Sequence, residues 1–129
     1  MNTQSHKDSV LALCDVIRET SYAVYNYLRS GHREQIYENA LAHRLSKLGV
    51  TVEQQSELRV YDEDGTLLGH LRADLLIENK LICEIKGVRG LVDEHVAQLL
   101  GYLRAARIEH GLLNKRRGPR LEIRKFIVN

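Results

Sequence analysis

The chain has 129 residues, the usual size of one domain and too few for two well-packed ones, so we expect a single domain over residues 1–129. Its hydrophobic content of 43% supports a folded core, and its charged content of 28% is ordinary for a soluble surface. The formal net charge of +2 is too small to indicate a nucleic-acid ligand by itself.

The sequence lacks the features expected of a secreted or membrane protein. The polar stretch 1–8 has no apolar core of a secretory signal, and no apolar run approaches the length of a membrane span. Cys14 and Cys83 stand inside apolar runs without a partner at metal spacing, so we expect two reduced core thiols, with a disulfide between them left open. These features predict a cytoplasmic protein that does not engage a membrane.

The first two predicted elements in chain order are helices. Residues 8–28 carry apolar side chains at helical spacing before a stop at Gly31, and residues 33–48 carry a second such stripe that ends at Gly49. Each apolar stripe predicts one buried helix face, and Tyr37 is expected in the core on this basis.

The spacing then changes to a partial alternation that is typical of strands. Residues 51–61 and 67–77 are predicted strands, and the Asp-Gly pair between them is a strong hairpin signal. A second tight turn at Glu78-Asn79 leads to a short strand at residues 80–86. These three strands are expected to form an antiparallel meander.

The last part of the chain is predicted to contain a helix at residues 92–106 and strands at residues 110–113 and 121–128. A turn is expected at residues 115–119 between the two strands. The predicted fold class is therefore α/β, with a central mixed sheet that contains the meander and is flanked by helices.

Basic residues crowd the C-terminal stretch, where Glu122 is the only acid. A basic face there could follow the phosphates of a nucleic acid, and a solubilising edge would give the same sequence pattern. Both interpretations stay open. The basic residues are Lys115, Arg116, Arg117, Arg120, Arg124 and Lys125.

Charged residues occur in two predicted strands whose other residues are mostly apolar, as in buried strands. Residues 80–86 carry apolar side chains on both faces, as a central strand does, yet Glu84 and Lys86 share one face. Asp74 lies in the middle of the apolar run before it, although Asp is a poor strand former. Strand pairing through the intervening turn would place Asp74 near Cys83 and Glu84.

Two carboxylates on adjacent strands repel each other unless a cation bridges them. Mg²⁺ takes one or two carboxylates, keeps several waters and accepts phosphate oxygens, and it activates a bound water for attack on a phosphate. The ammonium group of Lys86 would orient that water or offset developing charge. Asp74, Glu84 and Lys86 would thus form a hydrolytic set; the alternative is that each carboxylate is paired with a nearby base, such as Asp74 with Arg72.

Three motifs in this order resemble known nuclease families. Asp74 followed by Glu84-Ile85-Lys86 resembles the Asp…Glu-x-Lys signature of the PD-(D/E)xK nuclease superfamily. The segment GHREQIY at residues 31–37 resembles the motif that names the GxxExxY protein family, and QLLGY at residues 98–102 resembles the QxxxY motif of the RecB-like branch of the superfamily. The resemblance spans about residues 8–126.

The resemblance implies a restriction-endonuclease-like core and metal-dependent cleavage of phosphodiester bonds in DNA or RNA. It makes Mg²⁺ or Mn²⁺ the cofactor and nucleic acid, DNA first, the partner. The superfamily's proline before the aspartate is Ala73 here, which is a common change. Carried over by position, the metal ligands are Asp74, Glu84 and Glu34, the catalytic lysine is Lys86, and Gln98 and Tyr102 line the site from one face of a helix.

A non-catalytic module is the alternative function, in which a nuclease-like fold binds nucleic acid or a protein. Its motivation is size, because little beyond the core remains to select a substrate, so a protein partner or a homo-oligomer would supply specificity. Glu38, four residues after Glu34, is expected to be a solvated acid or an outer contact of the site. The histidines show no zinc-site spacing, and His95 is expected to be structural or at the rim.

Overall fold

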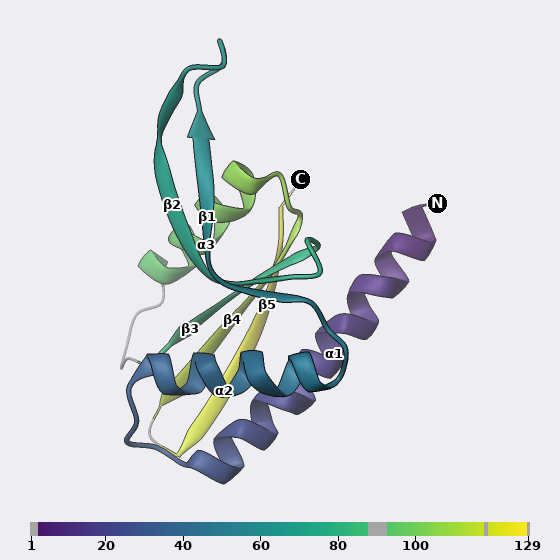
Figure 1. The fold of residues 1–129 in the computed structure, drawn as a ribbon, viewed down its shortest axis with the longest axis vertical. Helices are drawn as coiled ribbons and strands as arrows, with labels where there is room; N and C mark the ends of the chain where they lie inside the picture. Colours follow the sequence, from purple (N-terminus) through teal and green to yellow (C-terminus); the bar gives the residue numbers. More distant parts are fainter. Residues whose placement is uncertain (1–2, 88–92, 118, 129) are drawn as a thin grey trace.

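The computed structural model describes residues 3–87, 93–117 and 119–128, and it contains three helices and five strands in that part of the chain (Figure 1). The strands form one sheet in the order β1-β2-β3-β4-β5. The elements are α1 (Thr3–Leu28), α2 (Glu34–Lys47), β1 (Val52–Tyr61), β2 (Leu67–Ile77), β3 (Leu81–Lys86), α3 (Asp93–Ala106), β4 (His110–Arg117) and β5 (Arg120–Ile127).

The sheet is mixed. β1, β2 and β3 pair antiparallel, which confirms the predicted meander, and β4 pairs antiparallel with β5. β3 and β4 are parallel and are joined through α3, because two parallel neighbours need a long crossover connection. The carboxyl ends of β3 and β4 therefore lie at the same edge of the sheet.

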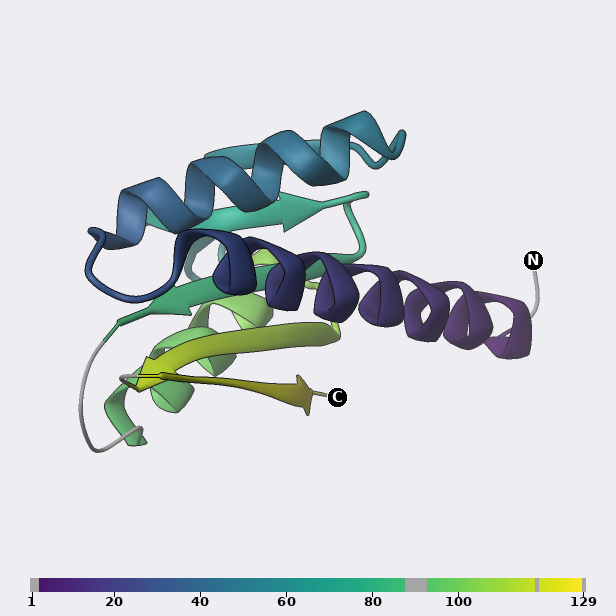
Figure 2. The same cartoon turned by 90° about the horizontal axis from the view of Figure 1, so that it is seen from below.

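Helices cover both faces of the sheet, so the predicted α/β fold with a central mixed sheet is confirmed. α1 and α2 pack on one face through residues such as Ile17 and Leu41, and α3 packs on the other through Leu99 and Leu103. Figure 2 shows α2 and α3 on opposite sides of the strands. β1 and β2 extend past the rest of the sheet as a long hairpin (Figure 1).

Most predicted bounds agree with the structure to within one or two residues, and β2 has the predicted bounds. α1 begins earlier than predicted, at Thr3, and the predicted start of the third helix at residue 92 lies outside the described residues. The prediction that the next strand ends at residue 113 was wrong. β4 continues to Arg117, because it pairs with β3 as far as Lys115 and with β5 to its end.

This longer strand also determines where two of the C-terminal basic residues lie. Lys115 is only 3% exposed, and its Nζ lies 4.0 Å from Oε2 of Glu122. Arg116 points to the other face of the sheet, where its guanidinium lies over the ring of Tyr37. Lys115 and Arg116 therefore lie on opposite faces of the sheet, and both interpretations of the remaining C-terminal bases stay open.

Two further expectations concern the core. Cys14 and Cys83 are both buried and free, which confirms the prediction of reduced core thiols. Tyr37 is buried in the core between the helices α1 and α2 and the sheet, as predicted. In the described part of the chain, none of the helices is long and apolar enough to span a bilayer.

Gly111 lets α3 approach β4 closely. A Cβ at this position would lie 2.9 Å from Leu103 and 3.1 Å from Leu99, inside the ordinary contact distance. We expect Gly111→Ala to lower the free energy of unfolding by about 1–3 kcal/mol, measured by urea denaturation. Gly101→Ala is the control, because its Cβ would meet nothing within 4 Å and alanine favours the helix. Equal stability of the two variants would contradict this account of the packing.

Candidate active site

Two acidic side chains lie where β2 and β3 part. The pairing between these strands ends at Leu75 and Cys83. Beyond that point the backbone N–H of Asp74 donates to Oε2 of Glu84 at 2.6 Å, and the N–H of Ile85 donates to Oδ2 of Asp74 at 2.8 Å. Each carboxylate thus takes the place of a backbone carbonyl on the neighbouring strand, and the two acids are fixed side by side.

Gln55 on β1 connects this pair to α2. Its φ of 50° is positive, and it has no partner in the β1–β2 register, whereas Gln54 and Ser56 on either side are paired. Its amide donates to Oδ1 of Asp74 at 3.3 Å and to Oε1 of Glu38 at 2.8 Å. A non-glycine residue with positive φ stores strain, and such strain is common at functional sites.

Glu38 is the third acid of this region and is only 3% exposed. The amides of Gln35 and Gln54 donate to its Oε2 at 3.1 and 2.9 Å, and Gln55 donates to its Oε1. Three side-chain amides therefore satisfy a buried carboxylate, which would otherwise be costly to bury. The expectation that Glu38 is a solvated acid was therefore wrong, because two of the glutamines that surround it come from β1, which helix spacing does not reveal.

Glu84 is the acid of this region whose pKa is strongly shifted. It is 2% exposed, and burial raises its pKa from 4.5 to about 8, with the charge of Asp74 adding to the rise. The hydrogen bond from the Asp74 backbone and the charge of Lys86 lower the pKa in part. In the protein without a bound cation, Glu84 therefore keeps its proton at neutral pH.

Lys86 and Tyr102 lie on the same side of the sheet as Glu84. Lys86 is half-buried at the end of β3, two residues beyond Glu84 and thus on the same face. Tyr102 on α3 is half-buried, and burial together with the charges of Glu84 and Asp74 raises its pKa. The structure thus brings Asp74, Glu84, Lys86 and Tyr102 together.

The structure places the other two predicted residues at the margin. Gln98 lies one turn before Tyr102 on α3 and is exposed. Glu34, at the start of α2, is also exposed, and its Oε1 accepts a hydrogen bond from the N–H of Gly87 at 2.8 Å. Glu34 is thus attached to the backbone just beyond Lys86, and neither residue is hydrogen-bonded to Asp74 or Glu84.

The carboxylate pair fits a hard divalent cation. Mg²⁺ requires only one or two carboxylates, and a cation would favour the charged form of Glu84, which burial and the charge of Asp74 disfavour. Within residues 3–87, 93–117 and 119–128, Asp74 and Glu84 form no ion pair with a base, so the predicted alternative of paired surface charges is not seen there. The same residues contain no group of three or more His, Cys, Asp or Glu side chains placed to hold a metal.

Comparisons with known proteins concern the family and the fold of the chain. A profile described as the PD-(D/E)XK nuclease superfamily matches residues 12–126. The crystal structure of SSO0001 is similar, with a TM-score of 0.60 and 23% sequence identity over 72% of this chain and 48% of that chain. This chain thus spans about half the length of SSO0001, and the likeness concerns the fold alone. No curated protein sequence matches, and the finer resemblance to the GxxExxY family stays a prediction.

Proposed function

Because the chain belongs to the PD-(D/E)XK nuclease superfamily, we propose that it is a metal-dependent nuclease that hydrolyses phosphodiester bonds of DNA or RNA. One observation carries the proposal. Two carboxyl groups, the half-buried Asp74 and the buried Glu84, are held together where two strands part, and neither forms an ion pair with a base among the described residues. Burying such a pair lowers the stability of the fold, and a bound cation would offset this loss.

Asp74 and Glu84 would hold the cation, Mg²⁺ or Mn²⁺, which when bound supplies a Lewis acid for the phosphate and a water of lowered pKa. The protein orients both ligands before a cation arrives. The N–H of Ile85 and the amide of Gln55 hold Asp74, and the N–H of Asp74 holds Glu84. This preorganisation avoids an ordering cost when the site is used.

Lys86 would place its ammonium against the attacking water or the phosphate oxygens, where negative charge develops. Tyr102 has a raised pKa and so keeps its proton at neutral pH, which makes its hydroxyl a donor to a phosphate oxygen. Gln98, exposed one turn earlier, would contact the substrate from the rim. Glu34 would hold the backbone after Lys86 through Gly87 and thereby position the lysine, or add a further oxygen ligand.

The proposal is tested with purified protein and labelled single-stranded DNA, double-stranded DNA and RNA. We expect at least one substrate to be cut with Mn²⁺ or Mg²⁺ and none to be cut with EDTA, because the two carboxylates alone cannot activate water. Three intact substrates with either metal would refute hydrolysis of these substrates. Binding of one of them without cleavage would instead support the non-catalytic module.

A further inference from the structure

Arg116 on β4 is held against an aromatic ring and has no acidic partner among the described residues. The Cζ atom of its guanidinium lies 3.6 Å from the centroid of the Tyr37 ring. The guanidinium also lies against Gly87, because a Cβ added to Gly87 would collide with its Nη2. Its Nε is buried without a hydrogen-bond partner, and Arg116 forms no ion pair with any carboxylate in the described part of the chain.

Tyr37 is a rigid support for this group. The ring is 4% exposed, and its hydroxyl donates to the carbonyl of Arg29 and accepts from the N–H of His32 at 3.4 Å. Gly31, with a φ of 108°, allows the tight connection between α1 and α2 that presents these backbone groups. An aromatic face attracts a cation but offers no strong hydrogen-bond acceptor, so the two terminal Nη groups of Arg116, unlike its buried Nε, remain available to an oxyanion.

Arg116 lies at the carboxyl end of the parallel strands. Lys86 and Lys115 are in register, so Arg116 is one position beyond Lys86 and next to Gly87. Lys86 faces α3 with Glu84, whereas Arg116 faces α1 and α2. Ligands of open α/β sheets bind at the carboxyl ends of parallel strands, and a nucleic-acid strand crossing this edge would meet both bases.

We propose that Arg116 binds a backbone phosphate of the nucleic acid, next to the phosphate at Asp74, Glu84 and Lys86. This rests on the proposed nuclease function and adds a substrate contact on the other face of the sheet. A guanidinium matches two phosphate oxygens with two N–H groups, which the ammonium of a lysine cannot do. Gly87 is part of the site, because any side chain there would displace the guanidinium.

The test measures binding of a fluorescent single-stranded DNA oligonucleotide and its duplex at several salt concentrations, with Ca²⁺ in place of Mg²⁺ to prevent cleavage. We expect Arg116→Met to weaken binding by about tenfold and to reduce the slope of log K against log salt by about one. Arg116→Lys should keep the slope and lose only a few fold in affinity, because it keeps the charge and loses the paired donors.

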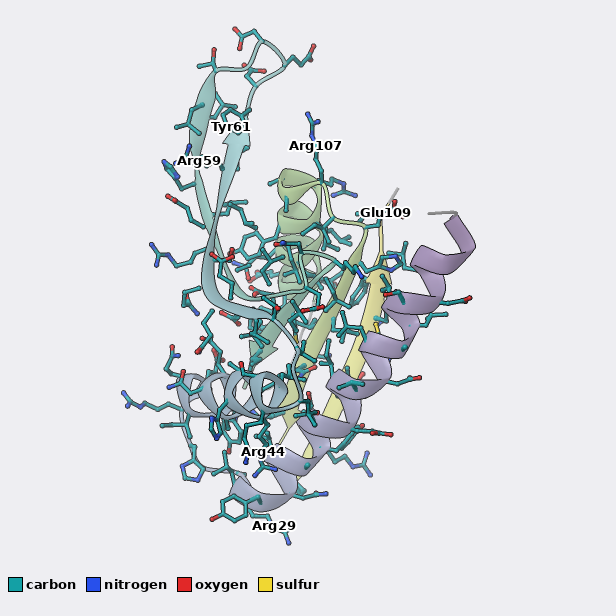
Figure 3. The ribbon with its side chains drawn as sticks, turned by 45° about the vertical axis from the view of Figure 1, so that its right-hand side comes forward. Arg29, Arg44, Arg59, Tyr61, Arg107 and Glu109 are labelled. Carbon is teal, nitrogen blue, oxygen red and sulfur yellow. The ribbon has the colours of Figure 1, made fainter. Side chains whose placement is uncertain are left out.

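Two further variants separate the position of Arg116 from its charge. Gly87→Ala keeps every charge and displaces the guanidinium, so binding should weaken several-fold. Arg44→Met is the matched control: Arg44 is also stacked on a tyrosine, with its Cζ 5.7 Å from the ring centroid of Tyr27, but it lies on α2 (Figure 3). Its loss should change binding less than twofold.

If a folded Arg116→Met protein bound with the affinity and salt slope of the wild type, the proposal would be overturned. Arg116 would then serve only to pack α2 against the sheet. If that variant does not fold, unchanged binding by Gly87→Ala and Arg116→Lys would overturn it. Wild-type protein that binds neither oligonucleotide would also do so. Loss of binding in the Arg116 variants, with no cleavage by the wild type, would refute the hydrolytic function and leave the phosphate contact in place.

Discussion

Asp74→Asn is expected to lower the rate of phosphodiester cleavage by about 10³-fold or more while the protein stays folded. Asparagine has nearly the same shape, and its carbonyl oxygen can still accept the hydrogen bond from the N–H of Ile85. What it removes is the negative charge that would hold a cation.

Lys86→Met should lower the cleavage rate by about 10²–10³-fold for a different reason, because it removes the ammonium group beside the phosphate. Single-turnover cleavage with saturating Mn²⁺ measures both rates.

Matched controls show whether these losses come from the site. Lys80→Met removes a lysine just before the other end of β3, where its Nζ lies 3.2 Å from the hydroxyl of Ser9. Glu53→Gln removes an exposed acid from β1. Both should cleave within about twofold of the wild type, as expected for solvated surface groups. Full activity in Asp74→Asn would mean that the acid pair serves the fold and not the chemistry.

The strand parting that holds the acid pair could be anticipated from local signals. The Asp-Gly turn and the turn at Glu78-Asn79 delimit β2, and both Glu78 and Asn79 have the positive φ of a tight hairpin turn. With the turn known, strand pairing places Asp74 near Glu84 within one residue. The conflict between a buried strand and its charges therefore predicts that these two carboxyl groups meet, and the structure confirms that they do.

The contacts around the acid pair could not be anticipated, because they join residues far apart in the sequence. Glu38 accepts hydrogen bonds from two glutamines of β1, and one of them, Gln55, also contacts Asp74 through its side chain. The sequence signal for these contacts is the pair of adjacent glutamines at positions 54 and 55. The sequence pattern predicts a turn at Lys115, because strand propensity does not reveal the pairing with β3 and β5 that keeps this residue in β4.

In metal-free buffer, the free energy of unfolding is expected to fall as the pH rises from about 5 to about 8. The folded protein keeps a proton on Glu84 up to a pKa of about 8, whereas the unfolded chain releases it near 4.5. Between these values the native state binds more protons than the unfolded state, so raising the pH favours unfolding. The full effect is at most about 5 kcal/mol, and above pH 8 it does not grow further. Urea denaturation in EDTA at several pH values measures it.

Glu84→Gln isolates this contribution from the histidines and other groups that titrate in the same range. Glutamine cannot ionise and still accepts the hydrogen bond from the N–H of Asp74, so the variant should be more stable than the wild type at pH 8 and less dependent on pH. Mn²⁺ should raise the stability of the wild type more at pH 8 than at pH 5, because cation and proton compete for Glu84. The variant should lose most of this response. If the free energy of unfolding of the wild type changed with neither pH nor Mn²⁺, the pKa of Glu84 would not be raised by folding and the acid pair would not bind a cation.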